Sequence, residues 1–514
     1  MGRRTTARAW RAPALETMLF GGLALWLGLL VFATPFNHDE DQYLAASVLA
    51  AKALLYRDFL YVQTPLQPEL TAWLTGLAPG WSFLVLRLAS AAFGLAALAG
   101  VWSAQRRLDV GRRAASAATL LMASAYTFQY CASVVRNDAL PMALLAWAIV
   151  AAASALREGG RRPWLGWGVC GLLLGAAVSA KISFAPLLAA AALSVCLPRA
   201  ALRPRGTEVG SFGLGALAGL APIALAWTRA PEAVRFALVG FWADGPRRWY
   251  VANGLEHRME PASKLLYGLG DLLLGPALAA LALVLLARLR PPRPAGAPAA
   301  RLLDLMILAG LVAAFAPSPT YKQYFAPLLP PLFIRLGLIA SQSRLPAWGR
   351  AALGLGAVTG LAIFAMRAGE AALTGRWTPI VVAQENRWIG DTLRQARASG
   401  AVATLSAHAV LDSGYPLDRR FAGGAMVYRS ADGVPEALRS RLHITSPVSL
   451  AADLDAASPA AIVTGYEDGG GDTRVRLDAP LRAYAQSRGY VLHRSPVAAA
   501  ALYIRPQGAS PVVR

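Results

Sequence analysis

Long apolar stretches, separated by short polar loops, recur along the chain up to about residue 370. A helix needs about 20 predominantly apolar residues to cross the hydrocarbon core of a bilayer. The windows of suitable length are 15–35, 81–101, 114–130, 139–155, 164–180, 182–197, 209–227, 265–287, 302–316, 326–340 and 351–366. The pattern predicts a mainly α-helical, polytopic membrane protein with about eleven transmembrane helices.

Two longer polar stretches, 36–80 and 228–264, interrupt this series and are predicted to form outer loops. We expect the first loop to hold two short surface helices around the turn that starts at Gln63. Inside the window 209–227, Gly213, Gly215 and Gly219 predict close packing against a neighbouring helix.

After Glu370 the pattern changes to that of a small soluble α/β domain. Residues 384–399 have helical spacing, and 480–488 predict a second helix. Short runs at 401–406, 460–466, 490–494 and 500–504 predict strands. We interpret 469–471, three glycines, as a loop rather than a phosphate cradle. The predicted domains are therefore 1–369, a transmembrane domain, and 370–514, an outer α/β domain.

The net charge of +21 at first suggests nucleic-acid binding, but its distribution argues against that partner. The arginines cluster in alternate short loops, which is the positive-inside pattern of membrane proteins. These loops contain Arg3–Arg11, Arg106–Arg113, Arg157–Arg162, Arg199–Arg205, Arg288–Arg301, and Arg344 with Arg350. We predict a bacterial inner-membrane protein, surrounded by membrane lipids, with a cytoplasmic N-terminus and a periplasmic C-terminal domain.

Three carboxylates, Asp39, Glu40 and Asp41, follow directly after the first apolar window, and Tyr43 lies just beyond them. Ionisable groups near lipid are expensive and commonly functional, and an outward carboxylate can act as a general base. The alternative is a helix start favoured by negative charge. Asp138, at the outer end of the window 139–155, is a further catalytic candidate or else an N-cap.

Cations recur at the same predicted outer surface. Lys181 follows one window, and Lys322 with Tyr324 precedes another. Such cations can hold a lipid phosphate, or they can extend to the interface without a ligand. Arg57, Arg247 and Arg248 are additional candidates from the two outer loops. We expect the carboxylates and cations to share one cleft.

Other chemistries lack support in the sequence. It contains no P-loop, no HExxH and no GxSxG pattern. The three cysteines, Cys131, Cys170 and Cys196, lie in or beside predicted spans and suggest neither a disulfide framework nor a zinc site.

The motifs resemble those of integral-membrane glycosyltransferases of the type C fold, which use polyprenyl-phosphate sugars. Relatives include protein O-mannosyltransferases and the bacterial aminoarabinose transferases of lipid A. The matching elements are Asp39-Glu40 after the first span, Tyr-Arg-Asp-Phe at 56–59, an aromatic-x-x-x-Pro turn from Tyr61 to Pro65, Asp138, and Tyr-x-x-Pro from Tyr324 to Pro327.

The resemblance implies that Asp39 is the catalytic base, that Asp138 supports the acceptor or donor site, and that Tyr324 lies near the lipid phosphate. The aminoarabinose transferases have Glu-Lys-Pro where this chain has Gln63-Thr64-Pro65. That difference argues against the same sugar and leaves Lys181, Lys322 or an arginine to neutralise the phosphate. No cofactor is assigned. A divalent metal ion is left open, and a metal site that needs the missing glutamate is in doubt.

The resulting hypothesis is a glycosyltransferase that moves a sugar from a polyprenyl-phosphate donor to a periplasmic glycan, lipid or protein, with inversion at the anomeric carbon. Residues assigned to the acceptor or the first loop are Asp41, Tyr43, Arg57, Asp58 and Gln63. Residues assigned to the donor phosphate are Lys322, Tyr324, Lys181, Arg247 and Arg248. The alternatives are a transporter or flippase for lipid-linked sugars and a non-catalytic envelope scaffold.

Overall fold

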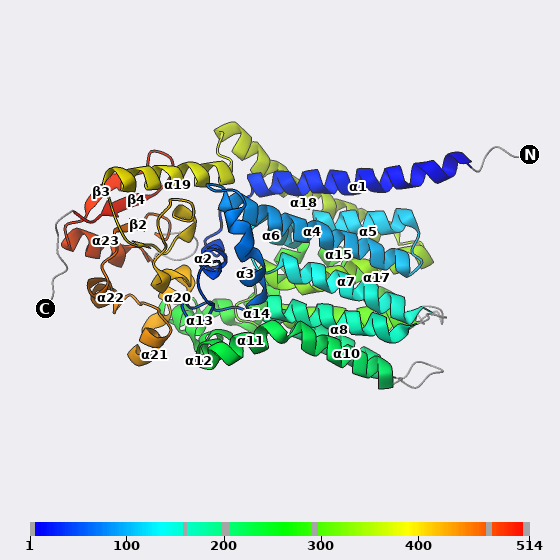
Figure 1. The fold of residues 1–514 in the computed structure, drawn as a ribbon. Helices are drawn as coiled ribbons and strands as arrows, with labels where there is room; N and C mark the ends of the chain where they lie inside the picture. The colour runs from blue at the N-terminus through cyan, green and yellow to red at the C-terminus, as the bar shows by residue number, and fades with distance from the viewer. Residues whose placement is uncertain (1–5, 158–161, 198–205, 290–296, 469–474, 507–514) are drawn as a thin grey trace, which may run out of the picture.

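The computed structural model describes residues 6–157, 162–197, 206–289, 297–468 and 475–506. The long helices form a bundle in which their axes are roughly aligned. A smaller mixed α/β segment covers one end of this bundle (Figure 1). Several arginines of the predicted basic loops (Arg3, Arg4, Arg161, Arg199, Arg203, Arg205, Arg290 and Arg293) and the glycines 469–471 lie outside the described residues.

The bundle is helical in every predicted window. Its helices are α1 (Thr6–Ala33), α4 (Ser82–Arg107), α5 (Arg112–Ser124), α6 (Tyr126–Ser133), α7 (Ala139–Leu156), α8 (Pro163–Ala180), α9 (Ala185–Cys196), α10 (Gly206–Gly219), α11 (Ala221–Arg229), α14 (Pro261–Leu273), α15 (Ala277–Arg288), α16 (Ala297–Phe315), α17 (Leu329–Gln342) and α18 (Ala347–Thr374). The prediction of a mainly α-helical, multi-pass membrane protein is confirmed.

The number of full-length spans is smaller than the number of predicted windows. Within the described residues, 7 helices are long and apolar enough to cross a membrane, or up to 9 if each bent pair counts as one span. The bent pairs are α10 with α11, at 44°, and α14 with α15, at 102°. The windows 114–130 and 182–197 form shorter helices, because the first is interrupted at the extended residue Ala125 and the second contains the 12-residue α9.

Glycines let α8 and α10 pack closely. A Cβ on Gly215 would lie 2.1 Å from the Gly168 carbonyl oxygen, and one on Gly219 would lie 2.2 Å from that of Leu172. Both positions therefore exclude a side chain, as predicted. At Gly213 a Cβ would meet nothing within 4 Å, so the prediction of close packing is wrong for that residue.

The predicted outer loops lie at the end of the bundle that carries the C-terminal segment (Figure 1). The first loop contains α2 (Glu40–Ala50) and α3 (Leu66–Thr71), and the second contains α12 (Pro231–Arg235) and α13 (Phe241–Ala252). The expectation that the first loop forms surface helices is wrong for α2, whose residues from Glu40 to Ser47 are buried. The C-terminal segment covers this helix, with Ala45 packed in the same apolar cluster as Ile389 and Leu393.

The C-terminal segment begins where α18 ends and Gly375 adopts a φ of 66°, a left-handed conformation that glycine tolerates. Its strands are β1 (Val402–Ala403), β2 (Ala461–Thr464), β3 (Val491–Arg494) and β4 (Ala501–Ile504). They form one sheet in the order β1-β2-β4-β3, with β1 and β2 parallel and the other pairs antiparallel. Its helices are α19 (Thr378–Gln395), α20 (Gly424–Tyr428), α21 (Glu436–Arg441), α22 (Leu450–Ala456) and α23 (Ala479–Ser487). The predicted small α/β fold is confirmed.

Candidate active site at the covered end of the bundle

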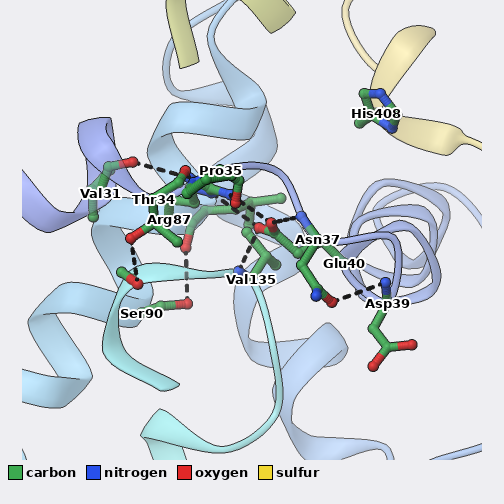
Figure 2. Close-up of polar contacts among 12 residues, drawn as sticks. Val31, Thr34, Pro35, Asn37, Asp39, Glu40, Arg87, Ser90, Val135 and His408 are labelled. Atoms are coloured by element: carbon green, nitrogen blue, oxygen red, sulfur yellow. Dashed lines mark hydrogen bonds and ion pairs between the residues drawn. The ribbon is translucent and has the colours of Figure 1, made fainter. Parts of the chain in front are cut away.

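Asp39 occupies the N-cap position of α2, but its side chain does not cap the helix. The Asn37 side chain accepts a hydrogen bond from the Asp39 backbone N–H at 3.1 Å, and Glu40 Oε1 accepts one from the Asn37 N–H at 3.0 Å. These two bonds satisfy local donors at the helix start. Asp39 itself makes no side-chain cap bond. Its carboxylate points away from the Arg87 cluster (Figure 2) and is free to contact other groups.

Glu40 is fully buried and bound on all sides (Figure 2). The Arg87 guanidinium donates to it at 3.0 and 2.5 Å, and the Val135 backbone N–H donates at 2.8 Å. Arg87 also donates to the carbonyl oxygens of Val31 and Thr34, at 3.0 and 2.8 Å. This ion pair joins the end of α1, the start of α2 and α4, which leaves Glu40 little freedom to meet a substrate.

Asp39 forms an ion pair with Arg136, whose Nη1 lies 2.6 Å from Asp39 Oδ2. The Nε2 of His38 lies 3.4 Å from the other carboxylate oxygen. Burial raises the pKa of the Asp39 carboxyl, but the Arg136 guanidinium and the His38 imidazole lower it by more, to about 2. The side chain keeps 21% of its surface exposed, so Asp39 is an ionised carboxylate that solvent can reach.

Asp138 occupies the N-cap position of α7 but makes no side-chain cap bond. Its fully buried carboxylate instead binds two cations. Arg136 Nε lies 3.1 Å from Asp138 Oδ2, and the Lys181 ammonium bonds Oδ1. The side chain of Asp138 therefore does not act as an N-cap, and its role in a site stays a prediction. Asp39, Arg136, Asp138 and Lys181 form a chain of alternating charge, which we call the four-residue ion chain.

Tyrosines extend this chain towards the remaining candidates. The Arg136 guanidinium lies 5.3 Å from the Tyr43 ring centre and 5.7 Å from that of Tyr130. Lys322 approaches the same Tyr130 ring, with Nζ 4.2 Å from its centre, and Lys181 lies 5.7 Å from the Tyr324 ring. Within the described part of the chain, the Lys322 ammonium forms no salt bridge, and the carboxylate that interacts with it electrostatically is Asp271 on α14. The structure therefore gathers Asp39, Asp138, Lys181, Lys322, Tyr324 and Tyr43 around one centre.

Gln63 contributes to this centre through a hydrogen bond with Asn137, the neighbour of Asp138. Asn137 Nδ2 donates to Gln63 Oε1 at 3.2 Å, and the same Nδ2 donates to the Ala180 carbonyl oxygen at 3.1 Å. The Tyr56 hydroxyl donates to the Gln63 carbonyl oxygen. Gln63 therefore holds Asn137, which flanks Asp138, and Asn137 in turn holds Ala180, which flanks Lys181.

Other sequence candidates lie elsewhere. Arg57 and Asp58 pair with each other at 2.9 Å. Arg248 binds Asp244 and the Gly433 carbonyl oxygen, and Arg247 is exposed. Among the described residues no contact joins these four to the ion chain, because their loops carry the side chains to the surface. Asp41 faces the C-terminal segment, where its Oδ1 accepts from the His408 backbone N–H at 2.8 Å and lies 2.9 Å from the His408 ring.

Three residues at this centre were not among the candidates from the sequence: Arg136, His38 and Glu467. Arg136 lies two residues before Asp138, and its placement in an outer turn was the only sequence signal. His38 precedes Asp39, and its Nδ1 lies 3.8 Å from Glu467 Oε2 in the C-terminal segment. Nothing local in the sequence connects residue 467 with residue 38. The described residues contain no group of three or more histidine, cysteine, aspartate or glutamate side chains that could hold a metal ion.

Comparisons with known proteins agree with this architecture. Residues 62–227 match the model of the dolichyl-phosphate-mannose-protein mannosyltransferase family. This matched segment is less than half of the chain and includes Arg136, Asp138 and Lys181. A search of curated protein sequences found no match.

Solved structures show the same fold. The ArnT protein of Cupriavidus metallidurans is similar in its apo state, with 16% identity, a TM-score of 0.58, and coverage of 96% of this chain and 98% of that one. ArnT bound to undecaprenyl phosphate is similar too, with 17% identity, a TM-score of 0.59, and coverage of 97% and 99%. An oligosaccharyltransferase of Archaeoglobus fulgidus has 12% identity, a TM-score of 0.51, and coverage of 98% and 76%. The chain therefore has the fold of type C glycosyltransferases.

Proposed function

We propose that this protein is a membrane glycosyltransferase that takes its sugar from a polyprenyl-phosphate donor. The observation that carries the proposal is the ion chain of Asp39, Arg136, Asp138 and Lys181, with the cation Lys322 beside it. The type C fold and the solved ArnT complex with undecaprenyl phosphate support the choice of donor class.

The charge balance of the centre suits such a donor. Asp39 and Asp138 neutralise Arg136 and Lys181, and Lys322 adds a positive charge that forms no salt bridge among the described residues, although Asp271 on α14 interacts with it electrostatically. A sugar joined to a lipid phosphate is a phosphodiester with a single negative charge. When the sugar leaves, the lipid phosphate gains a second negative charge, and we assign Lys181 and Arg136 of the ion chain to share it with Lys322. Fixed cations aimed at a developing charge stabilise the transition state.

Asp39 is the residue that we assign to the acceptor. Its carboxylate is ionised and partly exposed, and it accepts the proton of the acceptor hydroxyl as that oxygen attacks the anomeric carbon. The bond from the anomeric carbon to the phosphate oxygen breaks, and its electron pair leaves with the lipid phosphate. Attack from the face opposite the phosphate inverts the anomeric configuration. We place this centre on the periplasmic side of a bacterial inner membrane, with a glycan, lipid or protein as the acceptor.

The test compares envelope glycans, glycolipids and glycoproteins by mass spectrometry in cells with and without the gene. We expect one sugar modification to disappear on deletion and to return with the wild-type gene but not with Asp39→Asn. Loss of a general base lowers the rate by about 10²–10⁴. Asp109→Asn is the matched control, because Asp109 is 81% exposed and pairs with Arg157 away from the ion chain.

Two results contradict the proposal. Full modification by Asp39→Asn shows that this carboxylate is not the base. A deletion that changes the sidedness of a lipid-linked sugar while the purified protein transfers none indicates a flippase instead.

A further inference from the structure

His38 lies between two carboxylates that come from distant parts of the chain. Its Nε2 is 3.4 Å from Asp39 Oδ1, and its Nδ1 is 3.8 Å from Glu467 Oε2. The imidazole is 51% exposed, whereas the Glu467 side chain is only 7% exposed. One ring nitrogen therefore faces the proposed base, the other faces a buried carboxylate, and water reaches the ring.

The loop that carries Glu467 is held in place by its own hydrogen bonds. Asp478 Oδ2 accepts the backbone N–H groups of Gly465, Tyr466 and Glu467 at 2.7, 3.1 and 3.1 Å. The Tyr466 hydroxyl bonds Glu385 on α19. Glu467 Oε1 is buried without a hydrogen-bond partner. A buried carboxylate oxygen without a partner is costly, so a structural role alone does not account for Glu467.

The proposed reaction leaves a proton on Asp39, but a carboxylate with a low pKa binds a proton only weakly. Burial raises the pKa of Asp39, but Arg136, together with His38 while the imidazole is protonated, lowers it by more, to about 2. A general base works best when its pKa is near the operating pH. An imidazole meets that condition, and His38 is the one that contacts Asp39. Catalytic hydrogen bonds are often long before the substrate binds, so a separation of 3.4 Å is compatible with transfer.

We propose that His38, oriented by Glu467, takes from Asp39 the proton that the acceptor releases and passes it to water. Glu467 is then a positioning residue that the C-terminal segment supplies to the centre. This inference rests on the proposed function. The acceptor O–H bond breaks, and its electron pair forms the new bond to the anomeric carbon. The proton moves to Asp39, then to His38 Nε2, and then to solvent.

The charges around His38 allow this role. The Glu467 carboxylate, 3.8 Å from the ring, raises the pKa of the imidazole most, burial lowers it, the charge of Asp39 raises it, and the Arg429 guanidinium lowers it. The net direction is upward from the ordinary value. The pKa of the Glu467 carboxyl is itself raised, because burial and the charge of Asp41 raise it by more than His38 and His408 lower it. Protonated His38 cannot accept a further proton, so turnover falls as the pH drops through the pKa of this imidazole.

The first experiment measures kcat and acceptor KM against pH for the full-length protein, with the donor and acceptor identified by the glycan comparison. We expect an acid limb in wild-type kcat. In Glu467→Gln this limb moves to lower pH, because the carboxylate that raises the pKa of His38 is gone. His38→Gln loses the limb and lowers kcat by about 10², with KM little changed. Glu436→Gln, a surface change on α21, leaves the limb in place.

The second experiment does not depend on turnover. The chain has 5 histidines, and NMR of isotope-labelled histidine in detergent follows their titration. The His38 signal is the one that His38→Gln removes. We expect Glu467→Gln to lower the pKa of this signal and Glu436→Gln to leave it unchanged.

The outcomes separate the two proposals. If the protein transfers sugar but the acid limb does not respond to Glu467→Gln, the relay is overturned and the proposed function stands. The relay is also overturned if the His38 signal titrates equally in wild type and Glu467→Gln. If wild-type protein transfers no sugar, the proposed function fails, and the relay fails with it even where the NMR shift is present.

Discussion

Arg136 is the residue on which the proposed centre depends most. It pairs with Asp39 and Asp138 at 2.6 and 3.1 Å and lies over two tyrosine rings, so one guanidinium positions both candidate carboxylates. A planar guanidinium with several donors can hold two partners in fixed directions, which a lysine cannot do. One guanidinium therefore bridges Asp39 at the start of α2 and Asp138 at the start of α7.

At the same scale, Lys322 is predicted to hold the donor phosphate. Lys322→Ala removes a positive charge that has no salt-bridge partner among the described residues. It should weaken binding of undecaprenyl phosphate to the purified protein by about one to two decades, which corresponds to about 1.5–3 kcal/mol. Tyr324→Phe should weaken it less, because a neutral hydrogen bond contributes about 1 kcal/mol. Lys52→Ala, an exposed position in the first loop, is the control. Unchanged affinity in Lys322→Ala with a loss in Lys181→Ala would move the phosphate to Lys181.

Glu40 is predicted to act in stability rather than in proton transfer. Glu40→Gln leaves the buried Arg87 guanidinium without its counter-charge. Breaking one side of a buried ion pair costs about 3–5 kcal/mol, which thermal unfolding in detergent should detect as a large drop in Tm. Glu69→Gln is the control. Its 4.0 Å contact with Arg229 is exposed, and such pairs contribute about 0–1 kcal/mol. A stable Glu40→Gln protein without turnover would instead make Glu40 catalytic.

At the scale of elements, the packing of α8 against α10 places a cation of the centre. Lys181 follows α8 directly, and Ser179 on the same helix donates to the Gly219 carbonyl oxygen of α10 at 2.8 Å. The close approach of the two helices thus determines where Lys181 meets Asp138. It depends on glycines at which any side chain would touch the facing backbone.

Gly215→Val should therefore separate α8 from α10 and destabilise the protein. The added Cβ alone would lie 2.1 Å from the Gly168 carbonyl oxygen. A backbone atom cannot avoid this clash by changing rotamer, as a side chain could. Overpacking of this kind costs about 1–3 kcal/mol or more. Gly213→Val is the matched control in the same helix, because a Cβ there meets nothing within 4 Å. Equal Tm values for the two variants would show that the helices do not pack as closely as the structure has them.

At the scale of the whole molecule, the start of α1 and the strands β3 and β4 lie at opposite ends (Figure 1). The loops that contain α2 and α13 share one end with the C-terminal segment, and the N-terminal end of α1 is at the other. Basic loops at alternate helix ends predict that this second end is cytoplasmic. All parts of the proposed centre would then face the periplasm.

A reporter that works only in the periplasm should be active when fused after Arg514. The same reporter fused after Arg107, at the end of α4, should be silent, and a cytoplasmic reporter at Arg107 should work. Robust cytoplasmic activity after Arg514 would reverse the orientation and remove the basis for a periplasmic mechanism.

The sequence by itself determined the helical windows, the four strands and the short set of residues that converge. Apolar length and alternation are local properties, so they can be read without knowing the partners of each element. Asp39, Asp138, Lys181, Lys322 and Tyr324 were found in this way, because each lies at the predicted outer end of a span.

Only the tertiary structure decided what these residues contact. Glu40 became a buried partner of Arg87, the surface pair Arg57 and Asp58 lies apart from the centre, and Arg136 joined the two carboxylates. The contact of His38 with Glu467 spans most of the chain. Burial and ion pairing depend on which distant segments the fold brings together. The local sequence around a residue does not predict these long-range contacts. Asp39 and Glu40 are adjacent and chemically alike, yet Asp39 is partly exposed and Glu40 is fully buried. The difference arises because successive residues at the start of α2 point in different directions and meet different neighbours.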